Sequence, residues 1–597
     1  MKSTVIFISH VKELEKALRI CGKKKSKVKI ISCDPLSNLE MESRNIKYTE
    51  IGDYYPKNKI DFKNIKKDFL EDTWINLGIN YKSYNLCENT LFSFSNYLAE
   101  VEHSLLVAKN IIKREKPSKI IISEKWSELP YRRYQTEIFN MENISLLNLA
   151  RDKDIDVDIT DSSIIQKIKR VRFLFGLFLL AFNLKNIFVS LPAKKEQTKK
   201  IVFLGNFYQL KNLRNLLVKL KNTFEFTIIG KINKNESVLF SKLKLNFINI
   251  QENNYGIADS LRLIFSRFYY LFLWFMLKNK IKRKFPLLYW RLMEDKIFYH
   301  FIYEFPIMRV NIPSFENLLQ DCDYLITTAT SDNLSHTIAS VAKKGDAKII
   351  ELQHGILLTD IDKKFRLNDY YVLWGEKVRE VFNKEQNYVP CLGFPYFDKY
   401  PTKAHISNLK KIKRLLILSV FITGMGRRFV TDSSYLWLSS LFSEVSKIFS
   451  IKEVIFRTHP SSKAPWVKEL AKKYKINLIY DEGKLDLSET IRSSDAVVAN
   501  PTTALIDAMF FAKPILYYNF ANESIFPFSK TYLISSKAVL PLRNSMSINK
   551  TISSLTDKKV YNSLLSGQKS FLKNYCGIST KESSERLAQY LKKITSV

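Results

Sequence analysis

Short apolar runs rich in β-branched residues recur along the chain, and longer segments with helical spacing of apolar residues separate them. Runs of about four to eight apolar residues are typical of buried strands, and apolar positions three and four apart are typical of amphipathic helices. Strands that alternate with helix-length segments indicate parallel α/β sheets. The predicted strands form three series: 5–9, 28–32 and 119–123; then 201–206, 226–230, 247–250, 324–328 and 348–352; then 415–421, 454–458, 477–480, 496–500 and 515–518.

These three series predict three α/β modules. We expect an N-terminal module over 1–195, an acceptor-side Rossmann-like domain over 196–398, and a nucleotide-donor-binding Rossmann-like domain over 399–597. The segments 191–200 and 399–413 are polar and basic, which is typical of linkers. Because parallel sheets bind ligands at the carboxyl ends of their strands, we expect the second and third modules to face each other across a cleft.

Composition limits the classes of protein that fit. The chain has 597 residues, of which 46% are hydrophobic and 26% charged, and this excludes a mostly disordered protein. A formal charge of +35 favours anionic partners, namely phosphates, nucleotides, acidic lipids or nucleic acid. Lys and Arg are spread along the chain without a known nucleic-acid motif, so we expect no nucleic acid. Six cysteines without a CxxC pair, and an N-terminus typical of a strand entering a helix, favour the cytoplasm.

Two aromatic segments lie beside basic clusters. They are FLFGLFLLAF at 173–182 and FYYLFLWFML at 268–277. Neither reaches the ~18–20 apolar residues of a spanning helix, but both suit a helix lying in the interface of an anionic leaflet. The alternative is a pair of buried core helices with solvated charged ends. We therefore expect a peripheral protein on the inner face of the cytoplasmic membrane.

A histidine at the end of a second-module strand is the first candidate for chemistry. His354 follows the strand 348–352, and Gly355 lets the backbone turn there. A neutral imidazole at this place could take a proton from an acceptor hydroxyl. The alternative is a hydrogen-bonded structural histidine. Asp332, which follows the strand 324–328, is a rival catalytic base.

Two loops of the third module carry residues suited to phosphate. Arg457 and His459 follow the strand 454–458, and both side chains can contact a phosphate oxygen. Gly424, Gly426 and Arg427 lie in the loop after the first strand of this module and could wrap a diphosphate, although the spacing is not a dinucleotide-binding fingerprint.

A threonine-rich turn precedes a predicted helix over 504–512 in the third module. Thr502 or Thr503 can cap this helix, whose free N–H groups then favour an anion. Asp507 lies one turn further along on the same face and could accept hydrogen bonds from sugar or ribose hydroxyls. The alternative is an ordinary capped helix with a solvated aspartate. We expect the acidic turn at 481–483 to be a solvated loop.

Taken together, these segments resemble the GT-B glycosyltransferases of bacterial capsule and lipopolysaccharide synthesis, and they are similar also to the CDP-glycerol glycerophosphotransferases. The resemblance covers 320–520 well, 200–320 loosely and 1–195 hardly at all. The segments that carry it, in order, are Gln353-His354-Gly355, Tyr371–Glu376, Gly393–Asp398, Arg457–Pro460 and Pro501–Pro514. The fold that it implies is GT-B-like α/β, with two facing Rossmann-type parallel-sheet domains and an additional N-terminal α/β module.

The resemblance also implies roles for single residues. The His-Gly histidine of that group is the base, which corresponds to His354, and the His-Pro histidine contacts the donor phosphate, which corresponds to His459. The Ser/Thr turn binds phosphate, which corresponds to Thr502 and Thr503. Retaining members place a glutamate in the last helix, where this chain has Asp507.

The expected activity is transfer of a sugar from a nucleotide-activated donor to a glycan or lipid-linked acceptor in cell-envelope biogenesis. Transfer of glycerophosphate or a polyol phosphate from a CDP-linked donor is the alternative. A sugar-nucleotide epimerase and a non-enzymatic membrane- or nucleic-acid-binding scaffold are further alternatives. No DxD motif stands in a fitting loop, so we expect a metal-independent reaction without a cofactor.

Overall fold

The computed structural model describes residues 3–21, 27–56, 67–123, 141–160, 200–221, 224–231, 240–250, 257–328, 332–355, 367–380, 391–400, 411–419, 427–458, 464–499, 502–518, 532–542, 548–579 and 581–595. The aromatic segment at 173–182 and most of both predicted linkers lie outside these ranges.

Three sheets with parallel pairing form the framework of the chain. The first comprises, in spatial order, β3 (Thr49–Glu50), β2 (Lys27–Ser32), β1 (Ser3–Ile8), β6 (Lys119–Ile122) and β7 (Asp156–Ile159). The second comprises β10 (Phe247–Asn249), β9 (Phe226–Lys231), β8 (Ile201–Asn206), β11 (Tyr324–Thr327), β12 (Lys348–Leu352) and β13 (Tyr370–Val372). The third comprises β16 (Leu478–Asp481), β15 (Glu453–Thr458), β14 (Arg414–Ser419), β17 (Ala496–Ala499), β18 (Ile515–Tyr517) and β19 (Leu540–Pro541).

Each sheet has the strand order of a Rossmann-type fold. In the second and third sheets, the first strand of the series lies at the centre and the order is 3-2-1-4-5-6; the first sheet follows the same order with five strands. The central strands are apolar throughout because helices cover both faces, as in β17, where all four residues are buried. The predicted GT-B-like α/β fold with an additional N-terminal module is therefore confirmed.

The helices follow the strands in the expected alternation. Those of the first module are α1 (Val11–Cys21), α2 (Pro35–Ser43), η1 (Ile51–Tyr54), η2 (Lys67–Trp74), η3 (Ile75–Leu77), α4 (Leu86–Asn89), α5 (Leu91–Glu115) and α6 (Met141–Asp152). Those of the second are α9 (Phe207–Asn212), α10 (Arg214–Lys221), α12 (Ile257–Lys282), α13 (Leu287–Tyr299), η4 (His300–Glu304), α14 (Phe305–Leu318), α15 (Asn333–Lys344), α16 (Glu376–Arg379) and η6 (Pro395–Lys399). Those of the third are α17 (Arg427–Val445), α18 (Trp466–Lys473), α19 (Leu487–Ser493), α20 (Ala504–Phe510), α21 (Tyr532–Ser535), α22 (Ile548–Ser554), α23 (Lys558–Asn574) and α24 (Ser583–Thr595).

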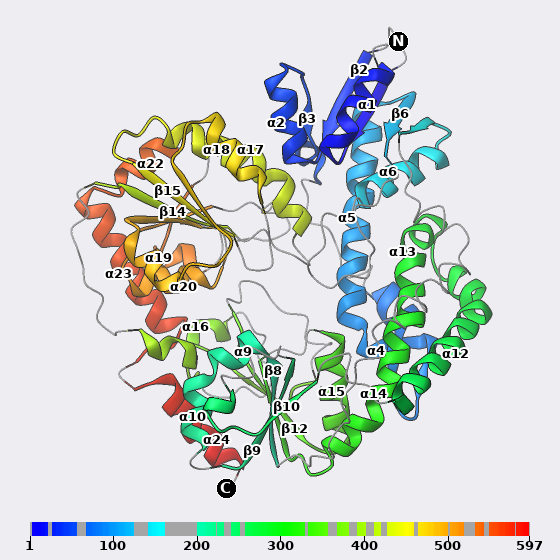
Figure 1. Cartoon of the computed structure of the whole chain (residues 1–597), viewed down its shortest axis with the longest axis vertical. Helices are drawn as coiled ribbons and strands as arrows, with labels where there is room; N and C mark the ends of the chain where they lie inside the picture. Colours follow the sequence, from blue (N-terminus) through cyan, green and yellow to red (C-terminus); the bar gives the residue numbers. More distant parts are fainter. Residues whose placement is uncertain are drawn as a thin grey trace.

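The first module shares a hydrophobic core with a helical layer of the second. Helices α12, α13 and α14 lie between β10 and β11 in the chain, and α5 runs from the first sheet down to them (Figure 1). His300 of η4 is fully buried, and its ring lies 5.3 Å from Trp74 and 6.0 Å from Phe94, measured between ring centroids. The first module is thus joined to the second by packed aromatic side chains.

The last helix returns to the second module. Helix α24 packs against α10, and the Tyr324 hydroxyl of β11 donates a hydrogen bond of 2.8 Å to the Ile594 carbonyl. Asp398 in η6 accepts hydrogen bonds from the backbone N–H groups of Ser583 and Ser584, both at 2.8 Å, and so caps α24. The predicted third module of 399–597 includes this helix, but the structure places it against the second module.

We expect Asp398→Ala to loosen α24, because the change removes both acceptors at its first turn. Loss of such a cap costs about 1–2 kcal/mol, so hydrogen exchange in α24 should rise about tenfold. The matched control is Asp557→Ala, which removes the cap on Lys559 and Val560 of α23. That variant should raise exchange in α23 alone, whereas unchanged protection of α24 in Asp398→Ala would contradict the prediction.

Candidate functional site

The strand order places the candidate site at the carboxyl ends of the central strands. In the third sheet the order reverses between β14 and β17, and ligands bind outside such a reversal. The loop after β14 holds Gly424 and Gly426, which lie outside the described residues. Arg427 begins α17, although its side chain is also outside the description. The predicted diphosphate loop therefore follows the strand at which the order reverses, and its contacts stay a prediction.

A buried glutamine shapes the turn that carries His354. Gln353 is 1% exposed, and its side-chain oxygen accepts a hydrogen bond of 2.8 Å from the Trp374 backbone N–H. Its side-chain N–H donates to the Gly355 carbonyl at 3.0 Å, while its own carbonyl accepts from the Trp374 indole at 2.8 Å. The ends of β12 and β13 are thereby joined, and the peptide turns tightly at Gly355, where φ is +108°.

His354 is accessible to solvent although protein surrounds it on most sides. Its side chain is exposed, in contrast to the buried residues 351–353 before it. Desolvation by the surrounding protein lowers the pKa of His354 from its ordinary value near 6.5. The imidazole is therefore neutral at neutral pH, and this is the form that can accept a proton.

The His354 turn meets the threonine turn of the third module. A Cβ atom built on Gly355 would lie 3.6 Å from the Thr503 hydroxyl oxygen, so the two turns are in contact across the junction of the two sheets. Thr503 is half-buried and, among the described residues, its side chain makes no capping hydrogen bond to α20. The Thr502 hydroxyl oxygen lies 3.4 Å from the Ala504 nitrogen. The structure therefore places the turn that holds His354 beside the turn that holds Thr503.

Asp332 has a structural role at the start of α15. One of its carboxylate oxygens accepts hydrogen bonds from the backbone N–H groups of Leu334 and Ser335, at 3.2 and 3.1 Å. The other accepts from the Ser335 hydroxyl at 2.6 Å. Both oxygens of the rival base are thus engaged in capping its own helix.

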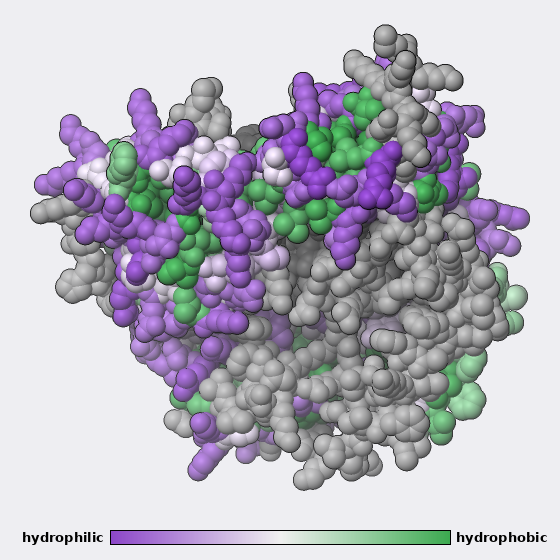
Figure 2. Space-filling model, turned by 45° about the horizontal axis from the view of Figure 1, so that its top comes forward, coloured by the Kyte–Doolittle hydropathy of each residue, from purple (hydrophilic) through white to green (hydrophobic). Residues whose placement is uncertain are grey.

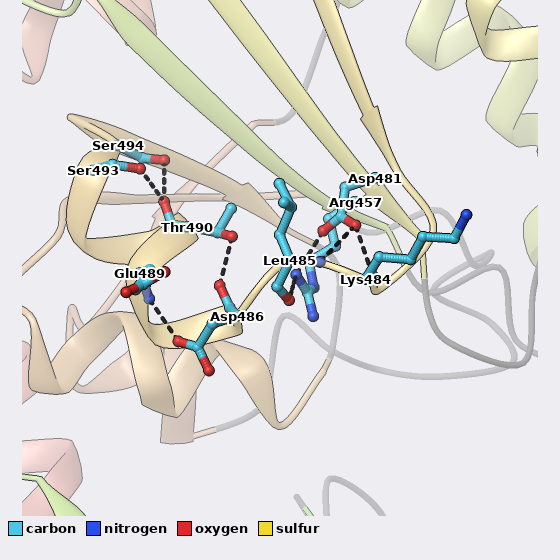
Figure 3. Close-up of polar contacts among 9 residues, drawn as sticks. All are labelled: Arg457, Asp481, Lys484, Leu485, Asp486, Glu489, Thr490, Ser493 and Ser494. Atoms are coloured by element: carbon cyan, nitrogen blue, oxygen red, sulfur yellow. Dashed lines mark hydrogen bonds and ion pairs between the residues drawn. The ribbon is translucent and has the colours of Figure 1, made fainter.

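Arg457 is held by a buried carboxylate. Its guanidinium forms an ion pair of 2.5 Å with Asp481 and donates to the Leu485 carbonyl at 2.8 Å (Figure 3). Asp481 also accepts from the backbone N–H groups of Lys484 and Leu485. The Asp481 side chain is 1% exposed, so the expectation of a solvated acidic turn at 481–483 is wrong for this residue. The described contacts of Arg457 fix the loop between β16 and α19, and its phosphate contact stays a prediction.

Asp507 lies inside the junction between the modules. It is 2% exposed and accepts a hydrogen bond from the hydroxyl of Tyr400. Burial raises the pKa of its carboxyl, although hydrogen bonds from Tyr400 and Tyr396 and the charge of Lys399 act in the opposite direction. The alternative of a solvated aspartate is therefore wrong, because the carboxyl is buried and connects α20 to the segment that crosses between the modules. Its contact with sugar or ribose hydroxyls stays a prediction.

Sequence reasoning missed Gln353 and Tyr400 as positioning residues. Gln353 belongs to the Gln353-His354-Gly355 segment, but a lone glutamine in a sequence gives no sign of the three hydrogen bonds described above. Tyr400 follows the Gly393–Asp398 segment, and an aromatic residue with a hydroxyl beside a module boundary is the one signal that could have pointed to it.

His459 lies outside the described residues, so its phosphate contact stays a prediction. Within the described ranges, no three His, Cys, Asp or Glu side chains gather closely enough to hold a metal ion.

No protein-family model matches the sequence, and no curated protein matches it either. Similar solved structures include UDP-GlcNAc 2-epimerase from Methanocaldococcus jannaschii, at 14% identity and a TM-score of 0.40, covering 66% of this chain and 99% of the other. MnaA of S. aureus with UDP gives 13% identity and a TM-score of 0.40, covering 67% and 97%. HepE of Anabaena with UDP and glucose gives 9% and 0.39, covering 67% and 100%. The fold assignment stands on the strand orders.

We expect Arg457→Ala to destabilise the protein, because Asp481 then stays buried without its cation. Removing one partner of a buried ion pair costs about 3–5 kcal/mol, which should lower the midpoint of denaturant unfolding. Lys484→Ala is the control, since Lys484 contributes only its backbone N–H to Asp481. An Arg457→Ala variant with unchanged stability and weakened nucleotide binding would instead give Arg457 the predicted phosphate role.

We expect Asp507→Asn to gain stability relative to the wild type as the pH rises. The folded-state pKa of Asp507 lies above its unfolded value of about 4, so the wild type loses stability as the pH rises from about 4 through the folded-state pKa. Asparagine cannot ionise but still accepts the Tyr400 hydrogen bond. Melting temperatures of both proteins across this range test the prediction, with Glu482→Gln at an exposed position as the control. A difference that is constant with pH would contradict it.

Proposed function

We propose that this chain is a metal-independent glycosyltransferase, which moves a sugar from a nucleotide-activated donor to a surface-polysaccharide or lipid-linked acceptor. One observation carries the proposal: the His354 turn of the second sheet meets the Thr503 turn of the third. A proton acceptor and hydroxyl donors from opposing sheets are the groups that such a transfer requires on its two sides.

The proposed roles follow from the chemistry of these groups. The donor phosphates bind along the third sheet, where the hydroxyls of Thr502 and Thr503 donate hydrogen bonds to them. The neutral imidazole of His354 takes the proton of the acceptor hydroxyl while its oxygen attacks the anomeric carbon of the sugar. The bond from this carbon to the phosphate oxygen breaks, and the electron pair leaves with the nucleotide. Hydroxyl and backbone donors at Thr502 and Thr503 stabilise the charge that develops on the leaving phosphate.

The lowered pKa of His354 supports its place in this scheme. A base must be unprotonated at working pH, and desolvation shifts the imidazole further toward that form. Asp332 and Asp507 are engaged in capping and in the junction between the modules, as described above. Among the candidate bases, His354 is therefore the one with an accessible side chain and no helix to cap.

We expect His354→Ala to lower kcat about 10²–10⁴-fold, because the acceptor hydroxyl loses its base. Binding of the donor nucleotide should change little, since its phosphates contact the opposite sheet. In the wild type, kcat/KM should fall with decreasing pH through a pKa below 6.5, and the variant should lack this limb. The control is His10→Ala, an exposed histidine that follows a strand of the first sheet. Full activity of His354→Ala would exclude His354 as the base.

Product analysis with a panel of nucleotide-sugars and CDP-glycerol distinguishes the alternatives. Sugar transfer releases the nucleotide and extends the acceptor with a sugar. Glycerophosphate transfer releases CMP and adds phosphorus to the acceptor, and an epimerase converts the sugar of the donor without net release of nucleotide. If the protein turned over CDP-glycerol and none of the nucleotide-sugars, glycerophosphate transfer would replace sugar transfer as the proposed activity.

A further inference from the structure

One face of α12 is apolar and exposed over most of the length of the helix. The exposed side chains recur at intervals of three and four residues, as expected for one face of a helix: Leu261, Phe265, Phe268, Phe272, Phe275 and Met276. Phe265 is 71% exposed, Phe272 64% and Met276 65%. A monomeric soluble protein seldom exposes so many contiguous large apolar side chains, so this face requires a partner.

The opposite face of α12 belongs to the protein core. Tyr270 and Trp274 are each 1% exposed, and the helix packs against η4 and α14. Within the aromatic segment 268–277, Phe272 and Phe275 are thus exposed, whereas Trp274 lies in the core and cannot contact a membrane. Figure 1 places α12 at the outer edge of the molecule, and Figure 2 shows apolar surface at this edge.

By length and composition alone, the helix Ala258–Lys282 could cross a membrane, contrary to the expectation that the segment is too short to span one. Only 39% of its most apolar stretch is buried inside the protein, and that buried share faces α14 and η4. A helix fixed along one side by core packing and apolar along the other has the form of an interfacial helix, which lies in the plane of the membrane surface.

Positive charge gathers at the end of the exposed face. Lys280, Lys282, Arg283 and Lys284 are exposed, and within the described residues none of them forms an ion pair. Lys278, one turn before, is paired with Glu294 at 3.0 Å and points back toward the protein. Aromatic side chains beside unpaired Lys and Arg match the acyl boundary and the phosphate layer of an anionic leaflet.

We propose that α12 binds the protein to an anionic lipid bilayer, with Phe265 and Phe272 inserted at the acyl boundary and the basic end of the helix on the lipid phosphates. The inference stands on the exposed face and its charges, and it is independent of the proposed transferase activity. The complementarity of the four exposed cations to lipid phosphate selects the bilayer as the partner, in preference to a second copy of a chain that itself carries a charge of +35.

The test is co-sedimentation of the full chain with vesicles of phosphatidylglycerol and phosphatidylcholine, compared with vesicles of phosphatidylcholine alone. The wild type should partition to the anionic vesicles, and added salt should weaken this binding. Phe265→Ser with Phe272→Ser, and separately Lys280→Glu with Lys282→Glu, should each lower the partition at least about tenfold. Melting temperatures should match the wild type, because all four side chains are exposed.

Two control variants make the same kinds of residue change at other places on the protein surface. Phe449→Ser changes a phenylalanine that is 94% exposed in the third module, and Lys592→Glu with Lys593→Glu makes the same charge change on α24. Both controls should bind like the wild type. Unchanged binding of the α12 variants would overturn the proposal, as would equal binding of the wild type to both kinds of vesicle. Light scattering tests whether a second copy covers this face instead. A wild-type dimer that the Phe265 and Phe272 changes dissociate, while vesicle binding persists, would overturn the proposal in favour of a second copy.

Discussion

The segment that crosses between the second and third modules holds the candidate site in place. Asp398 caps α24, which packs on the second module. Two residues later, the Tyr400 hydroxyl donates a hydrogen bond to the buried Asp507 of the third module. The connection between α23 and α24 passes so close to both Trp374 and Gly393 that a Cβ atom on Gly577 would clash with the Trp374 carbonyl oxygen and lie 3.2 Å from the Gly393 nitrogen. Trp374 also donates hydrogen bonds from its backbone N–H and its indole to Gln353. The junction therefore also fixes the turn that holds His354.

The strands could be predicted from the sequence because each central strand is buried on both faces, which leaves an unbroken apolar run in the chain. The bounds of β8, β12 and β15 agree with the predicted runs to within a residue. The candidate site was less predictable, since its polar residues have partners that are distant in the chain. Tyr400 and Asp507 are 107 positions apart, and Arg457 and Asp481 are 24 apart. A sequence identifies such groups as polar but does not show that they are already engaged.

The burial of the apolar residues in helix α12 could not be predicted from the sequence either. Residues 268–277 are apolar at nearly every position, so no periodicity separates a core face from a surface face. Only packing on η4 and α14 decides that Trp274 is buried while its neighbours Phe272 and Phe275 are exposed. The basic residues that follow could be predicted from the sequence as solvated, because charged side chains seldom lose contact with water. Lys280, Lys282, Arg283 and Lys284 are indeed exposed, although Ile281 and Phe285 beside them lie in the core.

The third module is tied to the rest of the chain at a second place, and this limits how the two sheets can move. Glu42 of α2 accepts hydrogen bonds from the Tyr435 and Tyr48 hydroxyls, at 2.7 and 2.8 Å, and forms an ion pair with Lys473 of α18. Burial alone would raise the pKa of Glu42, but the hydrogen bonds from Lys473 and the two tyrosines lower it, so the carboxylate remains charged. The first module in turn shares its core with η4 and the helical layer of α12. A rotation of the third module about 391–400 would therefore either carry the first module with it or break the contacts of Glu42.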